Sequence, residues 1–127
     1  MSLRSPLGRV RGLGSAKQGV SHFLWQRLTA LALVPLAVWF VLSVVSLAGA
    51  DYAHFRHWLS WPGNATLMLL LIFALFRHAQ LGLQVVVEDY VHDGGLRLIS
   101  LIAVKFLALF FGVFAAVSVL RVIFVGG

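Results

Sequence analysis

The residues best suited to chemistry lie in residues 77–90, RHAQLGLQVVVEDY, within a stretch otherwise apolar enough to span a bilayer. An ionisable side chain near the centre of a membrane costs a few kcal/mol or more, so such residues usually face a cavity, a cofactor or another chain. His78 has a small residue one helical turn before it, Ala74, and another one turn after it, Gly82. At about 100° per residue, these two and Asp89 fall within about 40° of the direction of His78. The helical period therefore predicts a strip along one face of the helix in which small side chains lie on either side of the His78 imidazole.

Two interpretations of this strip remain open. A porphyrin face reaches an axial histidine only where the neighbouring turns carry little bulk, and haem iron is commonly held by histidine, so the strip suits a haem. Alternatively, Ala74 and Gly82 form a small-residue packing face, and His78 hydrogen-bonds another helix. The chain has no cysteine and so supplies no thiolate zinc site or iron–sulfur ligand, which leaves histidine as its strongest candidate ligand for a transition metal.

A second polar stripe runs along the same helix. Arg77, Gln84 and Glu88 share a face about 100° from His78. A helix with this stripe cannot be surrounded by lipid, so we expect it to pack against other helices or a cofactor. A second membrane subunit or a homo-oligomer would provide them. In the alternative, Arg77 snorkels towards the membrane surface, but its position near mid-span makes that distance long.

The elements that carry these residues are predicted to be membrane helices. The chain is 61% hydrophobic and 11% charged, with a mean hydropathy of +0.96, too apolar for one small soluble core. Three apolar runs each reach the roughly 20 residues that a helix needs to cross a bilayer, and none alternates like a barrel strand. We predict an all-α membrane protein with a basic N-terminal arm over 1–21 and a three-helix domain over 22–127, its spans at about 28–50, 65–90 and 97–122.

The basic residues set the expected orientation. Four lie in the segment before the first span, with Arg27 at its edge, whereas the loop between spans one and two holds only Arg56. Arg97 lies in the loop between spans two and three. The positive-inside rule then places the N-terminus in the cytoplasm, or in the matrix of a mitochondrion, and the C-terminus on the opposite side. The net charge of +6 comes mostly from the arm, and the arm contains no nucleic-acid-binding motif. The four residues are Arg4, Arg9, Arg11 and Lys17.

Some residues support the architecture instead of chemistry. Pro35 is expected to kink the first span, and Trp58 and Trp61 to lie in the aromatic belt at the outer interface. Lys105 either snorkels inward or pairs with a carboxylate such as Glu88, and the sequence leaves both open.

The combined motifs resemble one family. The pattern His78-x3-Gly82-x6-Asp89-Tyr90 follows an uncharged first span that begins Ser21-His22-x4-Arg27-x-Thr29. In span number, spacing and loop length, most of the chain is similar to the small hydrophobic membrane anchor subunit of succinate dehydrogenase (respiratory complex II). That complex has a second, sister anchor subunit with a basic Ser-Pro-His signature before its first span. The signature is absent here, so the resemblance is to the hydrophobic anchor and not to its sister.

The resemblance implies roles for particular residues. His78 would be an axial ligand of haem b, whose other axial histidine comes from the sister anchor subunit. His22 and Arg27 would lie near the haem propionates, and Gly82 would leave room for the porphyrin. Asp89 and Tyr90 would form part of a ubiquinone site, in which the tyrosine hydroxyl holds the quinone carbonyl.

The expected function is that of a membrane anchor within an enzyme complex. The chain would bind the iron–sulfur and flavoprotein subunits to a bacterial inner membrane, or less expectedly to a mitochondrial one. It would share haem b and help to reduce ubiquinone in the respiratory chain and tricarboxylic acid cycle, with no succinate chemistry of its own. The alternatives are a haem-free structural anchor or assembly subunit, and the anchor of a quinol:fumarate reductase.

Overall fold

The computed structural model describes residues 16–126, which form four helices and no strand. Three of the helices are long and apolar enough to cross a membrane. The expectation of an all-α membrane protein with three transmembrane helices is therefore confirmed. The arm residues Arg4, Arg9 and Arg11 lie outside the described residues. The helices are α2 (Ala16–Ser46), α3 (Tyr52–Ser60), α4 (Pro62–Tyr90) and α5 (Gly94–Phe124).

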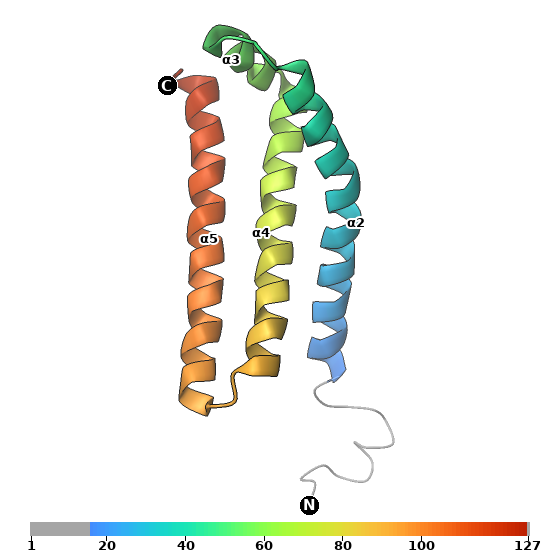
Figure 1. Cartoon of the computed structure of the whole chain (residues 1–127), viewed down its shortest axis with the longest axis vertical. Helices are drawn as coiled ribbons and strands as arrows, with labels where there is room; N and C mark the ends of the chain where they lie inside the picture. The colour runs from blue at the N-terminus through green and yellow to red at the C-terminus, as the bar shows by residue number, and fades with distance from the viewer. Residues whose placement is uncertain (1–15, 127) are drawn as a thin grey trace, which may run out of the picture.

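The three long helices form a single layer with α4 in the middle (Figure 1). Helix α4 packs against both α2 and α5, whereas α2 and α5 do not contact each other within the described chain. Few side chains are buried, and most large apolar side chains of α2 and α5 are exposed. The layer has almost no interior, so lipid or other protein chains must cover its two faces.

Helix α2 begins before the first apolar run and ends before the last residues of that run. It extends N-terminally through Ser21 and His22, and its part that is long and apolar enough to cross a membrane begins at Gly19. It ends at Ser46, and Gly49 then adopts φ 81°, a left-handed conformation that glycine tolerates in turns. Pro35 lies inside α2, which remains continuous and curves along its length (Figure 1).

Helix α3 lies across one end of the layer and was not predicted from the sequence. The side chain of Asp51 caps its N-terminus, and the ring of Trp58 stacks on that of Trp39 in α2 with centroids 5.8 Å apart. Arg56 donates from Nε to the backbone oxygen of Val122 at 3.1 Å, near the end of α5. Helix α3 therefore contacts both outer helices, which do not contact each other directly.

A short connection joins α4 to α5 at the opposite end of the layer. The side chain of Asp93 accepts a hydrogen bond from the backbone N–H of Leu96 and caps α5. Arg97 donates from Nη2 to the backbone oxygen of Glu88 at 3.1 Å. These contacts hold the two helices antiparallel and place the C-terminal end of α4 at the side that the charge pattern predicts to be inner.

Candidate functional site

His78 lies near the middle of α4 and is hydrogen-bonded to α2. Its Nδ1 is 3.1 Å from Oγ1 of Thr29, whose side chain is only 3% exposed. The Thr29 hydroxyl itself donates within α2, to the backbone oxygen of Trp25 at 2.8 Å and that of Gln26 at 3.1 Å. The hydroxyl has one proton, so when that proton lies on a backbone oxygen, Oγ1 can accept from Nδ1 of the His78 tautomer that is protonated there.

This hydrogen bond leaves the second ring nitrogen of His78 available. With Nδ1 protonated, a neutral imidazole carries a lone pair on Nε2. Nε2 has no hydrogen bond to the described part of the chain and is not enclosed. Histidines that bind metals almost always donate their other ring N–H to a fixed acceptor, which orients the ring and raises its basicity. The buried threonine therefore holds the direction of the His78 ring, as the partner of a metal-binding histidine does.

The space beside His78 is asymmetric. A Cβ added to Gly82 would meet nothing within 4 Å, so the turn after His78 is open. Ala74, in the turn before, is 4% exposed and lies inside the layer. No group of three or more residues that could hold a metal occurs in residues 16–126, so this part of the chain offers single ligands only. The free Nε2, the fixed ring and the open turn at Gly82 together fit one axial position of a haem.

The structure does not bring His22 and Arg27 to one place. His22 precedes Thr29 by seven residues, two turns, so it lies on the α4-facing side of α2, and its Nε2 is enclosed without a hydrogen-bond partner. Arg27 is exposed, with its guanidinium carbon 5.1 Å from the ring centroid of Phe23. The two point about 140° apart around the helix. Their place near haem propionates stays a prediction.

Asp89 and Tyr90 lie at the C-terminal end of α4, and both are exposed. Tyr90 is 77% exposed and is the last residue of the helix. It follows His78 by 12 residues, or about 18 Å along the helix axis. A phenol donor and a carboxylate are thus presented together at one end of the layer, well away from His78.

The second polar stripe of α4 is paired within the helix. Nη1 of Arg77 donates to Oε1 of Gln80 at 3.2 Å, and Nε2 of Gln84 donates to Oε1 of Glu88 at 3.1 Å. The amide of Gln84 is therefore the hydrogen-bond partner of the Glu88 carboxylate, and Lys105 in α5 is exposed.

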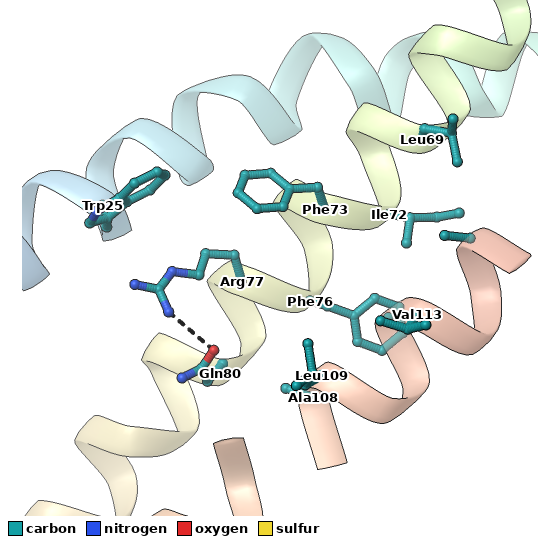
Figure 2. A pocket seen from close by; sticks show the side chains of 12 residues that line it. Trp25, Leu69, Ile72, Phe73, Phe76, Arg77, Gln80, Ala108, Leu109 and Val113 are labelled. Atoms are coloured by element: carbon teal, nitrogen blue, oxygen red, sulfur yellow. Dashed lines mark hydrogen bonds between the residues drawn. The ribbon is translucent and has the colours of Figure 1, made fainter. Parts of the chain in front are cut away.

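Arg77 and Gln80 also line an apolar groove of about 580 Å³ on one face of the layer (Figure 2). Helices α2, α4 and α5 all contribute to its walls, with Trp25, Phe73 and Phe76 supplying aromatic rings. The guanidinium carbon of Arg77 lies 5.4 Å from the ring centroid of Trp25. Neither His78 nor Gly82 lines this groove, so α4 presents two separate candidate regions.

Thr29 belongs to a motif in the sequence, but its role at the site was not predicted. A hydroxyl side chain in an otherwise uncharged apolar span is a weak signal, because threonine commonly hydrogen-bonds its own helix. Its contact with His78 depends on how α2 and α4 are rotated about their axes, which the sequence does not specify.

The three long apolar helices and their single layer define a class of multi-pass membrane protein. The family model described as succinate dehydrogenase/fumarate reductase transmembrane subunit matches residues 1–120. The chain belongs to this family. Membership makes it a subunit of an enzyme complex in the membrane.

Curated relatives agree with this assignment. A protein of Rickettsia bellii (strain RML369-C), named succinate dehydrogenase hydrophobic membrane anchor subunit, is 35% identical over 102 residues, covering 80% of this chain and 82% of the relative. A protein of the same name from Rickettsia conorii (strain ATCC VR-613 / Malish 7) is 31% identical over 80% of this chain and 82% of its own. A third protein of this name, from Rickettsia prowazekii (strain Madrid E), is 29% identical over 94% of this chain and 92% of its own. No solved structure matches the chain.

Proposed function

We propose that this chain is the hydrophobic membrane anchor of a succinate:ubiquinone oxidoreductase in a bacterial inner membrane, and that it holds one axial position of a haem b shared with a sister anchor subunit. The family and the names of the relatives support the anchor role. The haem role rests on one observation, the hydrogen bond from His78 to the buried Thr29, which leaves Nε2 free beside the open turn at Gly82.

Several residues of this chain would hold such a group together. His78 would supply the nitrogen ligand, and Thr29 would hold its ring direction from α2. Gly82 would leave the space that a flat macrocycle needs, and the apolar surroundings would exclude water. A bound haem would supply one-electron redox chemistry, with a potential tuned by its ligands and their hydrogen bonds. The sister anchor subunit would supply a further ligand.

A quinone site at the other end of α4 is the second part of the proposal. The exposed hydroxyl of Tyr90 donates a hydrogen bond to a quinone carbonyl at the predicted inner side, where the iron–sulfur subunit delivers electrons. Reduction to the quinol needs two electrons and two protons, and the neighbouring carboxylate of Asp89 is a group that can pass protons from water. Ubiquinone is a substrate here and the flavoprotein and iron–sulfur subunits are partners.

A second candidate function is that of a haem-free structural anchor. It is favoured by the fact that the hydrogen bond between His78 and Thr29 also joins α2 to α4 and so serves helix packing by itself. In a quinol:fumarate reductase the same anchor would work with electrons flowing in the opposite direction.

A reduced-minus-oxidised visible spectrum of the purified complex tests the main proposal. We expect the narrow bands of a low-spin b-type haem at one haem per copy of this chain. A complex that turns over succinate and ubiquinone without such bands would establish the haem-free anchor instead. Comparing succinate oxidation with quinol-dependent fumarate reduction in the same preparation identifies the favoured direction.

A further inference from the structure

Arg77 has too few partners in its own chain. A guanidinium carries five N–H donors. In the structure one hydrogen bond reaches Gln80, and the remaining close contact is with the ring of Trp25. All four acidic residues of the chain lie outside the middle of the spans, and the one on the same stripe, Glu88, is 11 residues or about 16 Å along α4. No carboxylate of this chain neutralises Arg77 at its own depth. The four acidic residues are Asp51, Glu88, Asp89 and Asp93.

The position of Arg77 makes this charge costly. It is 15 residues after Pro62 and 13 before Tyr90, so about 20 Å of helix separates it from either end of α4. Helix α4 is about 42 Å long and the hydrocarbon about 30 Å thick, so the membrane surface lies nearer than the helix ends. The guanidinium nevertheless lies 5.4 Å from the ring of Trp25, within the first span. A charged arginine inside the hydrocarbon is costly, and a compensating group from another chain would offset that cost.

The groove beside Arg77 has the dimensions of a helix-docking surface. Along α4 it extends from Leu69 to Gln80, about 16 Å or three turns. Its opposite wall on α5 is formed partly by the small residues Ala108, Gly112 and Ala116, spaced four residues apart. These small residues let α4 approach α5 closely, since Gly112 packs against Phe76, and they leave the floor of the groove low. Arg77 projects at one end of the groove (Figure 2).

We propose that this groove receives a transmembrane helix of a different chain that carries an aspartate or glutamate at the depth of Arg77. Carboxylate oxygens match the arginine fork in a bidentate pair, and each charge offsets part of the cost of burying the other. A second copy of this chain in the same orientation would bring its own Arg77 to that depth, and the two positive charges would repel each other. Lipid acyl chains offer no acceptor there. The proposal goes beyond the haem and quinone roles, because His78, Gly82 and Tyr90 do not line the groove.

Site-specific photocrosslinking in intact membranes tests the occupant. A benzoylphenylalanine at Leu109, which lines the groove and is 63% exposed, is compared with one at Leu31 on α2, which is 71% exposed and does not line it. We expect position 109 to give a crosslinked peptide from another chain whose membrane segment contains an acidic residue. A peptide from a second copy of this chain, a segment without an acidic residue, or adducts to lipid alone would overturn the proposal.

Charge variants then test the ion pair. We expect Arg77→Gln to lower the crosslink yield at position 109 about ten-fold, with Arg77→Lys retaining more of it, since an unpaired buried carboxylate disfavours the contact. Replacing the identified carboxylate by its amide in the Arg77→Gln background should restore the yield. An equal yield in the wild-type and Arg77→Gln chains, with unchanged crosslinks from position 31, would contradict the proposal. The haem spectrum, recorded on the same membranes, reports separately on the proposed function.

Discussion

Nδ1 of His78 and Oγ1 of Thr29 lie 3.1 Å apart across the contact of α2 and α4, although 49 residues separate them in the sequence. The threonine hydroxyl also lies 2.8 Å and 3.1 Å from backbone oxygens of its own helix, which fixes its position. One contact between two membrane helices therefore sets the direction of the His78 ring.

Replacing Thr29 by valine removes the acceptor while keeping the branched shape of the side chain. We expect haem affinity to fall about 10–100-fold, because a ligating histidine loses the partner that orients it. Haem content per complex and the reduction potential of the haem are the measurements. Thr29→Ser, which keeps the hydroxyl, is the matched control and should retain both. Unaltered haem content and potential in the valine variant would show that Thr29 only packs α2 against α4.

His78→Ala removes the proposed ligand and leaves a cavity in an apolar setting. We expect the low-spin b-type spectrum to disappear or to change to a high-spin form. The control is His57→Ala, since His57 is exposed in α3 at the opposite end of the layer from Tyr90. A low-spin spectrum that survives in His78→Ala would exclude this residue as a ligand.

Gly82 allows a graded test of the open turn. The structure accommodates a Cβ there without any contact within 4 Å, so Gly82→Ala should fold normally and gain about 1 kcal/mol of helix propensity. Gly82→Leu should place its bulk where the macrocycle approaches and lower haem content sharply. If the leucine variant contains haem at the level of the alanine variant, this face of α4 does not meet the porphyrin.

Tyr90→Phe tests the quinone site, because it removes one hydroxyl and little volume. Reduction of ubiquinone by succinate should slow by about 2 to 4 kcal/mol of barrier, since a hydrogen bond that strengthens as the quinone gains charge is lost. Electron transfer from succinate to a soluble artificial acceptor should stay unchanged. Tyr52→Phe, at the start of α3, is the control. Equal ubiquinone activity in both variants would reduce Tyr90 to an interfacial tyrosine, and equal loss in both assays would indicate failed assembly.

Arg56→Gln tests the contact that joins α3 to α5. The guanidinium donates to the backbone oxygen of Val122 close to the C-terminus of α5, where a cation also favours the helix dipole. We expect a loss of about 0.5–2 kcal/mol in stability, measured as a lower Tm of the detergent-solubilised complex, with an unchanged haem spectrum. Arg121→Gln, also in the last turn of α5 but exposed, should have a smaller effect.

The helix that carries the candidate site was predictable because its pattern is local. Residues 62–90 are mostly apolar, and the polar positions of the stripe recur with the helical period. This places Arg77 and His78 on different faces without any tertiary information. Helix α3 was not predicted because its nine residues are too few for a membrane span. Its capping residue, Asp51, lies in a segment whose sequence is typical of a loop.

The geometry around His78 was less predictable, since it depends on the neighbouring helix. The sequence treats Ala74 and Gly82 as equivalent small residues on either side of the ring. In the structure Ala74 is buried and the turn at Gly82 is open, because α2 covers one side of α4 and not the other. The same packing buries Thr29 against His78. Contacts between helices far apart in the sequence decide these details, and helical periodicity alone does not contain them.

The single layer formed by α2, α4 and α5 has a consequence for the life of the chain in the cell. Without an enclosed interior, the newly inserted chain has little to gain from folding alone, and its lifetime depends on meeting its partners. Until then, Arg77 has no carboxylate partner inside the membrane, which destabilises the inserted chain. We therefore expect the abundance of this chain to follow the supply of its partner subunits more closely than its own rate of synthesis.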